Sequence, residues 1–72
     1  MAEQVLTQVP GNVWKVLVKP GDVVKAGDTL FILEVMKTEV EHAATSDGTV
    51  ATVNITEGQE GIDAGILAVD IT

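Results

Sequence analysis

The pentapeptide Glu34-Val35-Met36-Lys37-Thr38 contains the side chain with the clearest potential for chemistry, the primary amine of Lys37. The preceding segment, Thr29 to Met36, is typical of a β-strand, and strand-forming sequence resumes directly after Lys37. A lysine between two strands projects into solvent, where a modifying enzyme can reach its amine. Lys37 is therefore a candidate for modification by another enzyme.

The rest of the chain lacks the residue groupings that catalysis requires. The absence of cysteine excludes disulfides, thiolate metal sites and cysteine nucleophiles. His42 is the only histidine, and on a strand it points away from the face shared by Glu39 and Glu41, so no metal site is expected. No glycine pattern that cradles phosphate is present. We therefore expect a protein that is not itself an enzyme.

Length and charge limit the possible architecture and partners. The 72 residues predict one domain, 1–72, with a core of about residues 9–71. The formal net charge of −7 repels phosphate backbones, so nucleic-acid binding is not expected. The longest apolar run, Leu30 to Leu33, is too short to cross a bilayer, and the N-terminus does not resemble a signal peptide. We expect a cytoplasmic protein without membrane contact, monomeric as an isolated domain.

The chain repeats itself once, at an offset of 37 residues with one extra residue in the second loop. Glycines in the first half match glycines in the second, and apolar residues match apolar residues. These are the positions that fix backbone conformation and core packing. The matched pairs are Gly11 with Gly48, Val13 with Val50, Val16 with Val53, Gly21 with Gly58, Gly27 with Gly65 and Leu30 with Leu67. The last pair is aligned at 37 again, which requires the extra residue to be lost before Leu67. The repeat predicts two similar halves related by a quasi-twofold axis.

Composition and periodicity both favour strands. Valine, isoleucine and threonine make up roughly a third of the chain. Trp14, Val16 and Val18 alternate with Lys15 and Leu17, the period of a half-buried strand, which predicts that Trp14 packs inward rather than serving as a cofactor platform. No segment has a sustained helical period. The predicted fold class is all-β, with two sheets packed face to face over a shared core.

The stretch from Thr29 to Ala43 must bend, although its residues do not mark where. It contains no glycine, proline, asparagine or aspartate, yet fifteen residues exceed the usual strand length of about 3–10. Tight hairpins favour Asn-Gly or Asp-Gly, and other residues in such a turn carry strain. Strain of this kind tends to occur at functional sites.

Several segments resemble the biotinyl and lipoyl attachment domains. The matching segments are Gly11-Asn12-Val13-Trp14-Lys15-Val16, Gly21-Asp22, Gly27-Asp28-Thr29-Leu30, Glu34-Val35-Met36-Lys37-Thr38, Ser46-Asp47-Gly48-Thr49-Val50 and Glu57-Gly58-Gln59. The first is most similar to free-standing biotin/lipoyl attachment proteins and to the carrier domain of urea carboxylases. The chain thus resembles the biotin carboxyl carrier type of this family.

The resemblance implies a flattened β-barrel, or sandwich, of two four-stranded sheets with quasi-twofold symmetry and no protruding thumb. It places covalent biotin on Lys37, on an exposed hairpin, with Glu34, Val35, Met36 and Thr38 as residues that a biotin–protein ligase recognises. The implied function is a non-catalytic carrier that shuttles carboxybiotin between biotin carboxylase and carboxyltransferase components. The acceptor substrate is not implied.

Two other functions stay open at this level. Lipoyl domains typically carry Asp-Lys-Ala at the attachment site, so Met36 favours biotin over lipoate as the cofactor. The commonest biotin signature, Ala-Met-Lys-Met, nevertheless differs from this chain at Val35 and Thr38. The second alternative is an unmodified interaction module, similar to the lipoyl-like hairpins of membrane-fusion proteins. Those usually lie within long chains with helical hairpins, which this sequence lacks.

Overall fold

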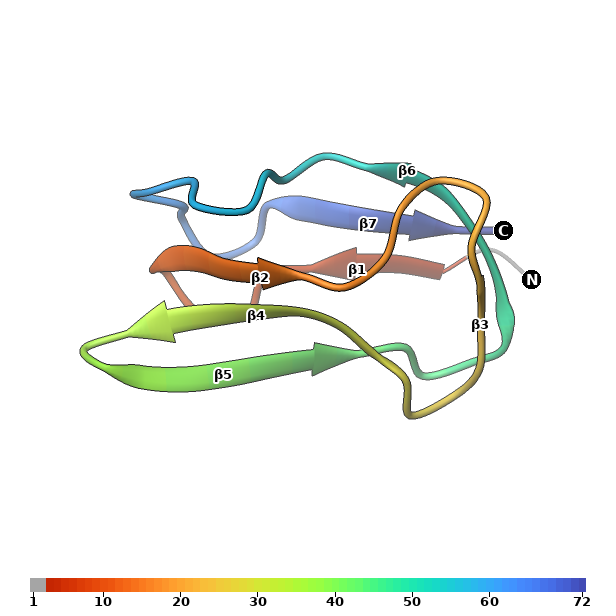
Figure 1. Cartoon of the computed structure of the whole chain (residues 1–72), viewed down its shortest axis with the longest axis horizontal. Helices are drawn as coiled ribbons and strands as arrows, with labels where there is room; N and C mark the ends of the chain where they lie inside the picture. Colours follow the sequence, from red (N-terminus) through yellow and green to blue (C-terminus); the bar gives the residue numbers. More distant parts are fainter. Residues whose placement is uncertain (1–2) are drawn as a thin grey trace.

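The computed structural model describes residues 3–72, in which seven antiparallel β-strands form two sheets (Figure 1). The four-stranded sheet has the order β1 (Glu3–Leu6), β7 (Leu67–Ile71), β6 (Gly48–Val53) and β3 (Val23–Val24), and the three-stranded sheet has the order β2 (Asn12–Val16), β4 (Thr29–Val35) and β5 (Thr38–Ala43). These residues contain no helix, and so none that is long and apolar enough to cross a membrane. The predicted all-β sandwich is confirmed.

The prediction of two four-stranded sheets is wrong in one detail, because the second sheet has three strands. Its fourth position holds a single bridge between Gly11 and Ile62. The equivalent position in the other sheet is the short pairing of Val24 with Gly48. Gly61 adopts a φ of 70° directly before Ile62, and this left-handed conformation interrupts the extended backbone that a strand would need.

The quasi-twofold repeat is confirmed, but its offset differs from the predicted one in the last strand. Val13 pairs with Leu33 as Val50 pairs with Ile71, so β2 and β6 are related by 37 residues and β4 and β7 by 38. The extra residue of the second loop is therefore retained. Leu30 corresponds to Ala68 and not to Leu67. The physical reason is burial, since β4 and β7 share one sequence of buried and half-buried positions from their first residues onward.

Both halves contain a β-bulge at the same place, and this overturns the inward prediction for Trp14. The register shifts between Val13 and Lys15 in one ladder and between the equivalent residues, Val50 and Thr52, in the other. The extra residue at the bulge is Trp14 in the first half, where it is 42% exposed. Because a bulge resets the alternation of a strand, Val13 and not Trp14 faces the core.

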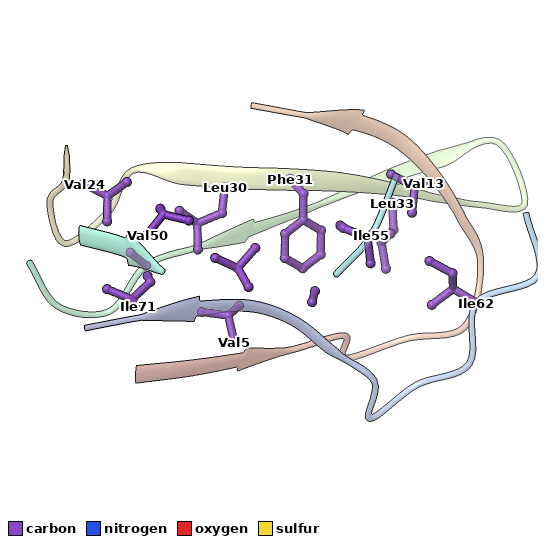
Figure 2. Close-up of a cluster of buried hydrophobic side chains, with 13 residues drawn as sticks. Val5, Val13, Val24, Leu30, Phe31, Leu33, Val50, Ile55, Ile62 and Ile71 are labelled. Atoms are coloured by element: carbon purple, nitrogen blue, oxygen red, sulfur yellow. The ribbon is translucent and has the colours of Figure 1, made fainter. Parts of the chain in front are cut away.

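The two sheets share one apolar core (Figure 2). Leu30, Phe31 and Leu33 of β4 are fully buried, as are residues 68, 69 and 71 of β7. Val16 and Val53 pack against this core from equivalent positions, where both are half-buried. Val5 of β1 also belongs to the core, so the packed unit begins before residue 9.

Side chains close the seam between the edge strands β1 and β5. The backbone N–H of Gln8 donates to Nε2 of His42 over 3.1 Å. At the equivalent place 37 residues later, the N–H of Thr45 donates to the Glu3 carboxylate over 3.2 Å. His42 is buried and stacks on Phe31 with 4.5 Å between ring centroids. Burial lowers the pKa of His42, and hydrogen bonds led by the Thr45 hydroxyl lower the pKa of Glu3.

A two-residue turn joins β4 to β5. Strand β4 ends at Val35, one residue before the predicted end at Met36. Val35 pairs with Thr38, and Met36 and Lys37 between them have φ values of 50° and 65°. Positive φ at both central residues is what a type I′ hairpin turn requires. The expectation of a strained turn built from residues other than glycine is therefore confirmed.

We expect acidification to weaken the fold through His42. Its native pKa lies below the solvated value of 6.5, so the unfolded chain binds more protons in this range. The stabilisation is complete above the unfolded pKa and is lost as pH falls through the native pKa, by up to about 1.4 kcal/mol per pH unit. Urea unfolding at successive pH values measures this slope. His42→Gln keeps an acceptor for Gln8 and should flatten the profile above the range where Glu3 titrates, whereas an unchanged slope would contradict the assignment.

Glycine at the first turn position should stabilise the protein. Met36→Gly relieves the left-handed strain on a side chain that packs against nothing, while it adds backbone entropy to the unfolded state, so we expect a net gain of about 0.5–1 kcal/mol. Met36→Ala keeps the Cβ atom and serves as the control, with an unfolding free energy within about 0.5 kcal/mol of the parent. Urea denaturation that ranks the glycine variant below the alanine variant would disprove strain at this residue.

Candidate functional site

Lys37 lies at one extremity of the molecule, on the tip of the β4–β5 hairpin (Figure 1). The C-terminus lies at the opposite end, beside the start of β1. Lys37 is exposed, and 93% of the preceding residue, Met36, is exposed as well. The amine is thus open to an approaching enzyme, as the sequence predicted. Its role as an attachment site stays a prediction at this point.

The stem of the hairpin is held by a close backbone approach from Gly11. A Cβ atom on Gly11 would lie 2.6 Å from the carbonyl oxygen of Glu34 and 2.8 Å from Cγ2 of Val35, so a side chain does not fit there. Gly11 and Ile62 exchange two backbone hydrogen bonds of 2.8 and 2.9 Å. The loop around Ile62 therefore holds the start of β2 against the end of β4, and this contact fixes the direction in which the hairpin projects.

Sequence reasoning used Gly11 only to align the two halves and missed its role under the hairpin. The signal was present in the repeat itself. Gly48 occupies the equivalent position and would place a Cβ atom 2.7 Å from the carbonyl oxygen of Thr72. Neither glycine has a positive φ, so the recurrence indicates close packing and not a turn.

The four residues predicted for ligase recognition do not present themselves equally. Glu34, Met36 and Thr38 are exposed, whereas Val35 is half-buried. Glu34 lies directly across the ladder from Glu39, and like charges in opposite positions repel each other. The structure thus gathers an exposed thioether and two carboxylates within a few residues of the amine, and it turns Val35 partly toward the protein.

The described residues around the hairpin do not form a metal-binding cluster. Within residues 3–72, no cluster of three or more histidine, cysteine or acidic side chains is placed to hold a metal. His42 is buried on the inner face of β5, whereas Glu39 and Glu41 are exposed on the other, as expected. A groove of about 530 Å³ is lined by residues 16–19 and 22. It lies near the start of β4, where the backbone N–H of Leu17 donates to the carbonyl oxygen of Leu30, and so lies far along the strand from Lys37.

Trp14 is a second candidate that sequence reasoning assigned to packing. Its indole is partly exposed on β2, and the Nζ atom of Lys15 lies 5.7 Å from the ring centroid. The signal that could have identified it is the mismatch in size with Ala51, the residue 37 positions later. A tryptophan matched to an alanine at equivalent strand positions is not explained by the needs of the core.

Comparison with known proteins places this arrangement in a family. The sequence model of the family described as "Biotin-requiring enzyme" matches residues 3–71. The chain is 44% identical over 57 residues to a biotin carboxyl carrier protein of Streptococcus mutans, covering 79% of this chain and 43% of that protein. It is 41% identical over 61 residues to the dihydrolipoyllysine-residue acetyltransferase component of the pyruvate dehydrogenase complex of Rhizobium meliloti, covering 85% of this chain and 14% of that protein.

Solved structures agree with the sequence comparison. The urea carboxylase of Kluyveromyces lactis contains a region that superposes with a TM-score of 0.89 at 36% identity, covering 100% of this chain and 6% of that one. The chain thus spans less than half the length of each of these relatives. Biotin carriers and a lipoyl-bearing component are comparably similar to it. The chain belongs to the biotin/lipoyl attachment-domain family, whose attachment domains carry a covalently bound cofactor and are not catalytic themselves.

Proposed function

We propose that this chain is a biotin carboxyl carrier domain that a biotin–protein ligase modifies on Lys37. The observation that carries the proposal is Met36, which precedes the lysine and is almost fully exposed at the tip. A ligase that positions the Lys37 amine must contact this side chain. An apolar thioether suits an apolar recognition pocket, whereas a pocket that accepts the aspartate of a lipoyl domain would be left with unpaired polar groups.

The residues at the tip fit a covalently attached biotin. Lys37 would hold it through an amide between Nζ and the biotin carboxyl group. Attack on an activated acyl group requires the neutral amine, which the ligase would have to provide. When bound, biotin supplies the ring nitrogen that accepts and releases a carboxyl group.

The contribution of the chain itself is presentation. The fixed stem holds Lys37 away from the body of the protein, so that a bound ring can enter a partner active site without the domain following it. Tethering also raises the effective concentration of the ring at both partner sites. Those partners would be a biotin carboxylase and a carboxyltransferase, in keeping with the names of the Streptococcus mutans and Kluyveromyces lactis relatives.

A lipoyl carrier is the second candidate, and one observation favours it. The acetyltransferase component of Rhizobium meliloti is 41% identical to this chain, close to the value for the biotin carrier. The framework therefore suits either cofactor, and the residues around Lys37 must decide between them.

Replacing the proposed attachment residue should abolish biotinylation without unfolding the protein. Lys37→Arg retains the charge at an exposed position, so the unfolding free energy should change by less than about 0.5 kcal/mol. Guanidinium does not serve as the acylated amine, and intact mass after incubation with ligase, ATP and biotin should show no adduct. The matched control, Lys19→Arg, changes another exposed lysine and should be modified fully. A biotin adduct on the folded Lys37 variant would remove this residue from the role.

Competition between the two ligases should yield biotinylated protein. With biotin, lipoate and both ligases at equal levels, intact mass should show chiefly the biotin adduct on Lys37. Met36→Asp should lower the biotinylation rate by about tenfold to a hundredfold, because a carboxylate would enter the apolar pocket unpaired. Met36→Leu, which stays apolar, should react at close to the parental rate. Lipoate as the main adduct of the parent chain would replace the biotin assignment with the lipoyl one.

A further inference from the structure

The two bulges of the fold differ in the side chain that they carry. Each half has its bulge at the same point of the ladder, and Ala51 fills it in the half that ends at the C-terminus. The backbone conformation of the bulge therefore does not require a large side chain. Trp14 fills the bulge in the half that leads into the Lys37 hairpin, and there its indole is 42% exposed. Bulges often re-aim a side chain near a functional site, and the bulge on this half turns a large aromatic ring toward solvent.

Trp14 lies within reach of a group carried on Lys37. The ladder places it level with Ile32 and Leu33 of β4, about four residues from Lys37, or roughly 13 Å at the rise of an extended strand. About ten bonds separate the lysine Cα from a biotin ring, which gives an extended arm on the order of 12 Å. An arm folded back along the outside of the sheet can therefore bring the ring to the indole.

The chemistry of the pair suits a ureido ring. The Nζ atom of Lys15 lies over the indole ring, 5.7 Å from its centroid, so a cationic donor stands above one aromatic face. The fused rings of biotin combine an apolar thioether side with a ureido carbonyl oxygen that accepts hydrogen bonds. The dithiolane of lipoate has no such acceptor.

We propose that Trp14 and Lys15 form a resting platform for the biotin ring carried on Lys37. The indole covers the apolar side of the ring, and the Lys15 ammonium donates to the ureido oxygen. The platform rests on the proposed function, since it needs biotin on Lys37. It gives the ring a place on the carrier between visits to partner sites, and it distinguishes the two cofactors by the ureido oxygen.

Tryptophan fluorescence tests the platform directly, because Trp14 is the only tryptophan of the chain. Intact mass first establishes complete biotinylation. Compared with the unmodified chain, the biotinylated chain should show an acrylamide quenching constant lower by about twofold, because the docked ring covers one face of the indole. Nuclear Overhauser contacts should join the indole protons to the methine protons of the biotin rings. Biotinylated Lys15→Met, whose side chain has no hydrogen-bond donor, should lose most of this protection, while the control Lys19→Met should keep it.

The outcomes separate the platform from the function beneath it. A chain without a biotin adduct on Lys37 overturns the proposed function and the platform together. A fully biotinylated chain whose quenching constant matches that of the unmodified chain overturns the platform alone. Protection that appears only after a carboxylase partner is added would assign Trp14 to docking of that partner and also overturn the platform. Equal protection in a lipoylated chain, or in Lys15→Met, would exclude recognition of the ureido oxygen.

Discussion

The burial of β4 in the shared core is the constraint on which the Lys37 hairpin depends. Leu30, Phe31 and Leu33 are fully buried, and a slip of one residue would turn Glu34 toward the core in place of Leu33. The register is therefore fixed, and Met36 and Lys37 are the residues left for the turn. Their left-handed conformations cost about 1–2 kcal/mol each. Burial of three large side chains, at about 1.5–3 kcal/mol each, outweighs that cost.

The proposed site lies where the symmetry of the fold is broken. The core, the bulges and the close approaches of Gly11 and Gly48 occur in both halves. Only one half leads into a two-residue turn with an exposed lysine, and only that half carries a tryptophan in its bulge. The local preference of the turn residues conflicts with the global fold there, as is common at sites that serve a partner rather than stability.

Sequence predicted the parts of the structure that depend on regular periods. The strands, the repeat and the exposure of Lys37 followed from alternation, from paired glycines and from resemblance to a family. The exposure of Trp14 was not predicted, because a bulge changes the alternation of a strand and no glycine or proline marks it in the sequence. The 38-residue offset between β4 and β7 was not predicted, because Leu30 and Leu67 match as residue types. The burial pattern instead makes Leu30 equivalent to Ala68. The missing fourth strand depends on the conformation of Gly61, which composition does not reveal.

The long axis of the molecule separates the Lys37 hairpin from the C-terminus. The protein measures 33 × 19 × 18 Å, its strands run mainly along the longest dimension, and the hairpin and the C-terminus occupy opposite ends (Figure 1). Hydrogen-bonded ladders resist bending, whereas a flexible linker loses reach to its own coiling. A host joined near Thr72 would therefore hold the lysine at the far end of a stiff strut. For the cofactor that we propose on Lys37, the folded body would add nearly its whole length to the reach of the lysine arm, without any entropy of extension.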